Sequence, residues 1–365
     1  MTLLRPSWIC IFLVLSSLTV LAQAPFLVAP LPSSPLELAT AATMIVNTPQ
    51  NRTLVLGLLE RARQNSGELY AVGGPPFTLR ISFTASGQAR YTGSGDMEET
   101  RYSRQLWRWS ARLGSYSQLR VFQNGMGYDE KPPGPIPLRI QMVRGAIFWP
   151  MLQVRPGQAM RMASAKWNGM EVMCALLGNE VETSTSGGRA WGEKEYCVDP
   201  QEGQLRIYSE APGSYVTYDY TDALHFHGRI LAREIAINEA GEAVLQLHLE
   251  SISDPGPPDA SRFIPSRRML ANGAGIIVLR APIRLKETAP AAAGYAGTIQ
   301  PVIIHAALDD HGKVVEAEPL QIGDPNLNNV ALNLVRHATY YTQHKERGFP
   351  VQDEAFIQVS FGGSR

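Results

Sequence analysis

The chain has 365 residues, with 33 basic and 33 acidic side chains, so its formal net charge at pH 7 is zero. This balance argues against nucleic acid and other polyanions as partners, because proteins that bind them carry a basic patch or stripe. A chain of this length is longer than a typical domain with one hydrophobic core, so we expect one large domain and one smaller domain.

The first 24 residues predict a secretory signal peptide. Arg5 supplies the positive charge, residues 8–21 form an apolar run, and Ala22-Gln23-Ala24 fits the small-x-small cleavage pattern. The run is shorter than the roughly 20 apolar residues that a bilayer span needs. We therefore expect a cleaved signal peptide and a periplasmic protein, with an uncleaved N-terminal membrane anchor as the alternative.

Two cysteines remain after cleavage, Cys174 and Cys197. In an oxidising compartment an isolated pair predicts a disulfide. The closed loop of about 24 residues would contribute roughly 3 kcal/mol in the chain-entropy model. A metal or redox pair is the alternative, which the wide spacing without C-x-x-C disfavours.

Residues 51–287 predict a mostly antiparallel β domain that follows an extended lead-in at 25–50. The apolar spacing of residues 53–64 predicts an amphipathic helix, with Asn51 as its N-cap. Residues 77–84 alternate apolar and polar side chains, which is the period of a half-buried strand. Among the further elements, we expect a helix at 137–149 and strands at 106–110, 119–122, 205–208, 215–220, 230–237 and 243–249.

The C-terminal part predicts a separate small unit. Small residues at 288–297 indicate a linker, and residues 298–365 predict strand, strand, helix and strand, with Asp324 and Pro325 marking the start of the helix. The expected fold class is α+β. It combines a large, curved, half-barrel-like antiparallel sheet and its covering helices with a small ββαβ domain.

Several short motifs at fixed spacing fill residues 301–361. They are A-x-x-D-D-x-G-K-V-x-E-A at 306–317, a helix at 327–337, R-G-F-P-V at 347–351 and the closing I-Q-V-S-F. Together they resemble the C-terminal domain of TonB-type energy transducers. The aromatic-x-aromatic-x-Pro run of that family is broken at 338–342, and no long Pro-rich spacer is evident. The resemblance implies the small ββαβ fold.

We expect this TonB-like unit to dock an envelope or outer-membrane protein, by adding a strand to an exposed sheet edge. Ile357, Val359 and Phe361 of the closing strand are the residues expected to bind that partner.

The element order in residues 50–285 is a leading helix, many antiparallel strands, an inserted helix and a late F-I-P loop. This order resembles the periplasmic lipoprotein-carrier (LolA-like) half-barrel. In that fold a curved sheet and its helices enclose an apolar cavity for acyl chains. The resemblance implies a lipid or acyl ligand, with Trp107, Trp109, Phe148 and Trp149 as candidate contacts. The same aromatic side chains suit an ordinary core equally well.

Catalytic motifs are missing from the sequence, which contains no G-x-S-x-G, no H-E-x-x-H and no P-loop. His225 and His227 would share a face on a strand, but no third ligand follows at a known metal spacing, so we expect no metal and no cofactor. We expect a binding and transport-accessory protein that is not an enzyme. The alternatives are a membrane-anchored, atypical TonB-type transducer for outer-membrane transport and an envelope hydrolase with a non-obvious site.

Overall fold

The structure is a computed structural model. It describes residues 44–45, 48–66, 69, 74–131, 134–148, 158–178, 191–257, 259–275, 281–290, 301–320, 324–340, 345–346, 349–350 and 353–362. The expected signal peptide at 1–24 and most of the lead-in lie outside these residues. Among the helices in this part of the chain, none has the length and apolar character needed to cross a membrane.

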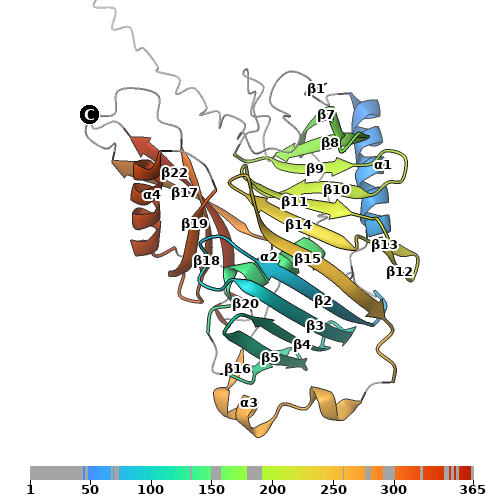
Figure 1. The fold of residues 1–365 in the computed structure, drawn as a ribbon, viewed down its shortest axis with the longest axis vertical. Helices are drawn as coiled ribbons and strands as arrows, with labels where there is room; N and C mark the ends of the chain where they lie inside the picture. Colours follow the sequence, from blue (N-terminus) through green and yellow to red (C-terminus); the bar gives the residue numbers. More distant parts are fainter. Residues whose placement is uncertain are drawn as a thin grey trace, which may run out of the picture.

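Most of the described strands belong to one large, curved antiparallel sheet (Figure 1). In chain order they are β1 (Met44–Ile45), β2 (Phe77–Ala85), β3 (Gly93–Ser103), β4 (Leu106–Leu113), β5 (Tyr116–Gln123), β6 (Met126–Asp129), β7 (Ala159–Trp167), β8 (Met170–Gly178), β9 (Lys194–Val198), β10 (Leu205–Ser209), β11 (Ser214–Asp219), β14 (Glu234–Glu239), β15 (Glu242–Ser253) and β16 (Ala274–Gly275). In space they run β1-β7-β8-β9-β10-β11-β14-β15-β2-β3-β4-β5-β6-β16. The expected large antiparallel sheet is therefore confirmed.

Tight turns hold the neighbouring strands in register. Asn124 and Gly125 have φ of 54° and 83°, and Asn168 and Gly169 have φ of 49° and 80°. Positive φ at both residues is the geometry of two-residue hairpins, which Asn-Gly favours. The strand expected at 230–237 is divided in the structure. Its first residues belong to β13 (Arg229–Leu231), which pairs with β12 (Leu224–Phe226), and its last residues, from Glu234 on, belong to β14.

Two helices pack against the large sheet. The first, α1 (Pro49–Ser66), begins earlier than predicted, and Oγ1 of Thr48 accepts a hydrogen bond from the backbone N–H of Asn51 at 3.2 Å. Thr48 is therefore the capping residue, and the prediction of Asn51 is wrong, because Pro49 fits the first helical position. The second, α2 (Leu138–Phe148), has nine buried residues among its 11, so it is an internal helix of the core.

The C-terminal unit has its own sheet. Its strands β17 (Ile283–Pro290), β18 (Val302–Leu308), β19 (Val314–Pro319) and β22 (Asp353–Gly362) lie in the order β17-β22-β18-β19. Residues 288–290 of the expected linker are thus the end of β17, which pairs in parallel with β22.

The helix α4 (Pro325–His337) begins as predicted, because the side chain of Asp324 accepts a hydrogen bond from the N–H of Asn326 at 2.8 Å. Four short elements complete the description: η1 (Ala260–Phe263), α3 (Arg267–Asn272), β20 (Lys345–Glu346) and β21 (Phe349–Pro350).

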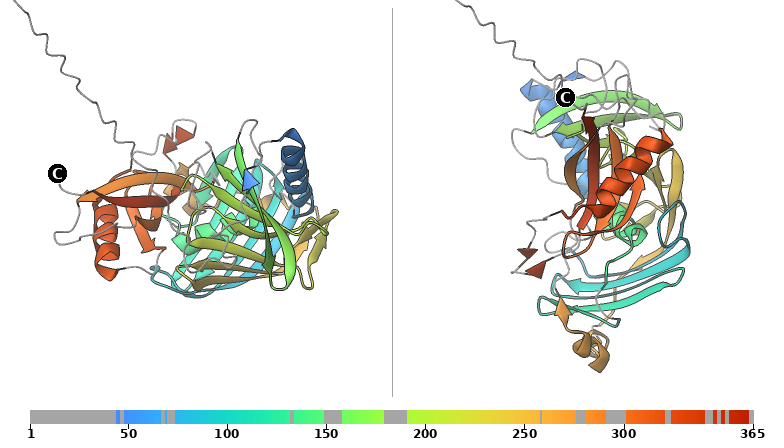
Figure 2. Two further views of the ribbon diagram at one scale, coloured as in Figure 1. Left: turned by 90° about the horizontal axis from the view of Figure 1, so that it is seen from above. Right: turned by 90° about the vertical axis from the view of Figure 1, so that its left-hand side faces the viewer.

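Strand β18 is buried on both of its faces. One face packs within the C-terminal unit and the other packs against the large sheet, so the two units lie side by side (Figure 2). Ile304 and Ala306 pack in the core beneath α4, whereas Ile303 packs with Trp191 of the large unit. Because side chains alternate along a strand, His305 shares the face of Ile303 and points toward the large sheet. The junction between the two sheets therefore contains a buried histidine.

Candidate functional site at the junction of the two sheets

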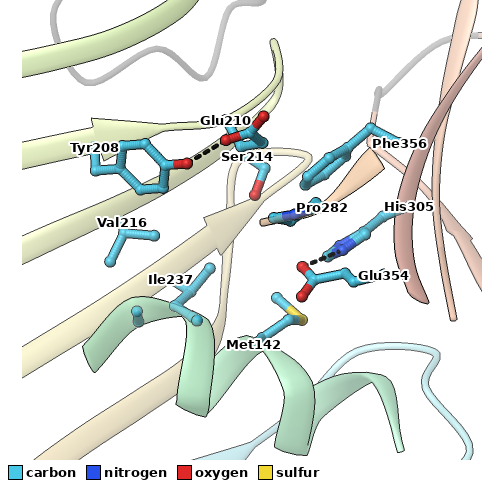
Figure 3. Close-up of a pocket in the computed structure, with 12 residues that line it drawn as sticks. Met142, Tyr208, Glu210, Ser214, Val216, Ile237, Pro282, His305, Glu354 and Phe356 are labelled. Carbon is cyan, nitrogen blue, oxygen red and sulfur yellow. Dashed lines mark hydrogen bonds and ion pairs between the residues drawn. The ribbon is translucent and has the colours of Figure 1, made fainter. Parts of the chain in front are cut away.

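A pocket of about 40 Å³ lies at this junction, between α2, the large sheet and the small sheet (Figure 3). Its lining divides by chemistry. The apolar part comprises Met142, Gly145, Ala146, Val216, Ile237, Pro282 and Phe356, and the polar part comprises Tyr208, Glu210, Ser214, His305 and Glu354. Such a division suits a ligand with an apolar portion and a polar end.

The register of the large sheet explains the apolar part of the pocket. Val216 of β11 lies directly opposite Ile237 of β14, and both side chains point to the inner face, which we define as the face that contacts α2. The hydroxyl of Tyr218, on the same face, donates to the carbonyl of Ala146 at 2.9 Å and fixes α2 there. The pocket lies where α2 presents its smallest residues, Gly145 and Ala146.

A buried ionic cluster lies beside the pocket, and His305 is its centre. The Nδ1 of His305 lies 2.6 Å from Oε1 of Glu239, and its Nε2 lies 2.8 Å from Oε1 of Glu354. The ring is 1% exposed and stacks on Phe356 at 4.2 Å. Since Glu239 belongs to the large sheet and Glu354 to the small sheet, His305 bridges the two units.

Arg139 extends this cluster into α2. Its side chain is 0% exposed, with Nη1 at 3.3 Å from Oε2 of Glu239 and Nη2 at 2.7 Å from Oε2 of Glu318. Its Nε and Nη2 also donate to the carbonyl of Ser86, at 3.1 and 3.0 Å. One guanidinium therefore ties α2, the large sheet and β19 together through buried charges.

The pKa values of this cluster follow from burial and charge. Burial lowers the pKa of His305, but the carboxylates of Glu239 and Glu354 outweigh it and raise the pKa to about 10. Burial raises the pKa of Glu239, yet His305 and Arg139 hold it below its usual value. At neutral pH the structure thus contains an imidazolium between two carboxylates.

This arrangement predicts a loss of stability at alkaline pH. Because the folded-state pKa of His305 lies above its ordinary value of 6.5, its stabilisation is fully present below pH 6.5 and is lost as pH rises toward about 10. The difference in free energy of unfolding between wild type and His305→Gln should therefore shrink over this range. Urea unfolding at a series of pH values measures it, and a difference that stays constant with pH would refute the charged bridge.

A second set of charges lies on the opposite side of the pocket, around Glu210. The hydroxyl of Tyr208 donates to its carboxylate, as Figure 3 shows, and Nζ of Lys194 lies 2.8 Å from it. Arg284 of β17 approaches the same carboxylate, with Nε at 3.4 Å, and donates to the carbonyl of Trp191 at 2.6 Å. The carboxylate of Glu210 is therefore neutralised by Lys194 and Arg284, and Arg284 forms a second link between the two sheets.

Three of the aromatic residues predicted to contact a ligand are buried in the core. Trp107, Trp109 and Phe148 are 5%, 0% and 2% exposed. Trp107 stacks on Phe122, Phe148 stacks on Phe77, and the guanidinium of Arg144 lies 5.0 Å from the ring centre of Trp109. None of the three lines the pocket at the junction. The fourth predicted residue, Trp149, lies outside the described residues.

The closing strand does not offer the edge expected for partner binding. Ile357, Val359 and Phe361 lie on β22, which pairs with β17 along one edge and with β18 along the other. Ile357 and Val359 are 0% exposed and pack beneath α4. The expectation that a partner strand adds at these residues is therefore corrected, because the neighbouring strands already use their backbone groups.

The remaining predicted residues lie away from the pocket. A disulfide joins Cys174 of β8 to Cys197 of β9, which are direct partners in the ladder. His225 lies in β12, whereas His227 follows it in a turn with φ of 48°, and its Nε2 lies 2.8 Å from Oδ1 of Asp254. The two histidines therefore do not continue one strand face.

The sequence did not point to Glu210, Ser214, His305 or Glu354 of the pocket. His305 and Glu354 lie in strands recognisable from their apolar neighbours, but no local pattern distinguishes them. The weak signal for the pocket on α2 is Gly145, because glycine is unfavourable inside a helix.

Comparisons with known proteins add little to this geometry. No family model and no curated protein matches the sequence. Similar solved structures include a LolA superfamily protein from Nitrosomonas europaea, with 10% identity over 56% of this chain and 94% of that chain and a TM-score of 0.35. They also include an outer membrane lipoprotein-sorting protein domain from Vibrio parahaemolyticus (9% identity, 57% and 95% coverage, TM-score 0.33) and LprF from Mycobacterium bovis (8%, 56% and 96%, 0.23). Function is therefore inferred from the residues of this chain.

Proposed function

We propose that this protein is an exported, non-enzymatic carrier that binds an acyl chain, from a lipid or a lipidated protein, in the pocket between α2 and the two sheets. The observation that carries the proposal is that apolar side chains of α2 and the large sheet line the same pocket as the polar side chains of Glu210 and Glu354 (Figure 3). The acyl chain would contact Val216, Ile237 and the small residues of α2. Its polar end would lie between Glu210 and Glu354, which are on opposite sides of the pocket.

In this proposal the pocket must widen to take an acyl chain. A volume of about 40 Å³ holds only about three water molecules, so an acyl chain enters only if the pocket widens. Burial of roughly 0.8 kcal/mol per methylene group supplies the driving force. The movable wall is the small sheet, which contributes His305, Glu354 and Phe356 and is held partly by ion pairs.

The C-terminal unit has a second role in this proposal, which is to dock an envelope protein. The TonB-like motifs of the sequence support this role. The strand that would accept a partner is β17, an edge of the small sheet, whereas β22 is internal. The accepting part is its exposed stretch at Lys286 and Thr288, beyond Arg284, which binds the large unit. The other edge, β19, faces the large unit, since Glu318 accepts a hydrogen bond from the N–H of Gln88 at 3.2 Å and an ion pair from Arg139.

Filling the pocket from α2 tests the carrier function. A Cβ added at Gly145 would lie 4.0 Å from Oε2 of Glu354, so Gly145→Ala fits, whereas the longer side chain of Gly145→Leu occupies the pocket. We expect Gly145→Leu to bind cis-parinaric acid at least about tenfold more weakly than wild type, because removing about two buried methylene contacts costs that much. Fluorescence titration measures the affinity.

The matched control is Gly57→Leu, a change of the same kind in α1, where an added Cβ has no atom within 4 Å. Both substitutions favour the helix equally, so only the pocket distinguishes them. Equal affinities for Gly145→Leu and Gly57→Leu, or no binding by wild type, would reject the carrier function.

A further inference from the structure

A much larger groove, of about 530 Å³, lies on the outer face of the large sheet, opposite the face that contacts α2. It lies over β11, β14 and β15, and the β7–β8 turn borders it. Its volume falls within the range of about 300–1,000 Å³ that is typical of small-molecule sites. The carrier pocket lies on the other side of the sheet, so the groove is a separate site.

The register of three strands builds the floor of the groove. Thr217 of β11, Ala236 of β14 and Gln246 of β15 are direct partners in one row across the sheet. Their side chains point outward, because their neighbours Val216, Ile237 and Leu245 are buried on the inner face. The small side chain of Ala236 leaves space between Thr217 and Gln246.

An aromatic residue stands at the border of this floor. The β7–β8 turn, with Asn168 and Gly169 at positive φ, brings Trp167 and Asn168 to the groove. Trp167 packs in part against the apolar cluster around the disulfide, and the rest of its side chain is accessible. A partly exposed indole beside polar side chains offers a flat apolar surface to a ligand.

The charges of the groove disfavour an anionic ligand. Thr221 donates to Asp219 through its N–H and its hydroxyl, which lowers the pKa of Asp219 and keeps it charged. Glu234, opposite Asp219 in the ladder, adds a second carboxylate. Arg206 is the cation that lines the groove, and Asp199 pairs with it at 3.2 Å.

The polar groups match a ligand with many hydroxyls. Asn168, Thr217 and Gln246 both donate and accept hydrogen bonds, and Asp219 and Glu234 accept them. A hydroxyl group also donates and accepts, so it can pair with each of these groups.

We propose that the outer-face groove binds a neutral saccharide, with one sugar ring against Trp167 and its hydroxyls on Thr217, Gln246 and Asp219. The site is independent of the acyl-chain pocket. It would allow the protein to hold a glycan and an apolar ligand at the same time, on opposite faces of one sheet.

Ligand-observed saturation-transfer NMR with maltotriose, cellotriose and chitotriose tests the proposal on the intact protein. We expect at least one trisaccharide to bind. Trp167→Ala should weaken it about tenfold, the effect of losing one aromatic contact. Ala236→Leu, which fills the floor and leaves every polar group in place, should weaken it by at least as much.

The control is Ser94→Leu, at an exposed position of β3 in the same row beyond Gln246 and Thr84. It should leave saccharide binding unchanged. Absence of binding by all three trisaccharides would overturn the proposal, as would equal binding by wild type and Ala236→Leu. Binding of choline at the groove in place of any saccharide would also overturn it, in favour of a cation site formed by Trp167 and the two carboxylates.

Discussion

Replacement of Arg139 by methionine is expected to lower the free energy of unfolding by about 3–5 kcal/mol, the usual effect of removing one partner from a buried ion pair. The guanidinium is 0% exposed and binds Glu239 and Glu318. Methionine retains much of the length and the apolar stem of the arginine side chain. The measured loss of stability therefore reports mainly the removal of the positive charge. Glu318 is then left buried without its cation.

The same variant should be less destabilised at acidic pH. Burial raises the pKa of Glu318, although Arg139 opposes this effect. Once the arginine is gone, the carboxyl takes up a proton more readily, and a neutral carboxyl costs less to bury. Urea unfolding at neutral and acidic pH measures both parts of the prediction.

Arg112→Met is the matched control for Arg139→Met. Arg112 also pairs with a carboxylate, since its Nε lies 2.7 Å from Oδ1 of Asp96, but the two side chains are 72% and 46% exposed. Solvent screens this pair, so its loss should cost no more than about 1 kcal/mol. Equal destabilisation by the two substitutions would mean that the buried cluster does not hold the units together.

Gly312→Ala is expected to destabilise the C-terminal unit by roughly 3 kcal/mol or more, since backbone strain and overpacking add. Gly312 has φ of 77°, and an added Cβ would overlap the backbone carbonyl oxygen of Tyr340. The carbonyl of Gly312 also accepts a hydrogen bond from the N–H of Tyr340 at 2.8 Å, so the two segments cannot separate freely. Thermal unfolding measures the loss.

Gly228→Ala separates these two contributions. Gly228 has the same φ of 77°, but an added Cβ there has no atom within 4 Å. It should cost only about 1–2 kcal/mol, the strain of a left-handed alanine. If Gly312→Ala were no more destabilising than Gly228→Ala, the backbone of Tyr340 would not lie close to Gly312 in the folded protein.

Local patterns predicted much of the fold. The alternation of residues 77–84 predicted β2, the helix expected at 137–149 is α2, which begins one residue later, and Asp324 with Pro325 marked the start of α4. These signals depend on neighbours in sequence. The acidic start of β3 has no alternating pattern, so the sequence did not predict that strand. The strand also contains Gly95, which lies opposite Phe83. A side chain does not fit there, because a Cβ would be 2.6 Å from the carbonyl oxygen of Arg112.

The site could not be predicted from local patterns, because it depends on contacts between residues far apart in the chain. Arg139, Glu239, His305 and Glu354 come from α2, β14, β18 and β22, and nothing in the sequence pairs them. The aromatic residues gave a stronger local signal, but Trp109 and Phe148 proved to be core residues. An apolar side chain looks the same in sequence whether protein or ligand covers it.

The pocket beside α2 is proposed to bind an acyl chain. Native mass spectrometry with lipid extraction tests it most directly, on wild type, Gly145→Leu and Gly57→Leu purified from the cell envelope without detergent. We expect a co-purifying acyl lipid or acylated peptide on wild type and Gly57→Leu, and its loss from Gly145→Leu. A ligand-free wild-type protein that also fails to bind cis-parinaric acid would contradict it.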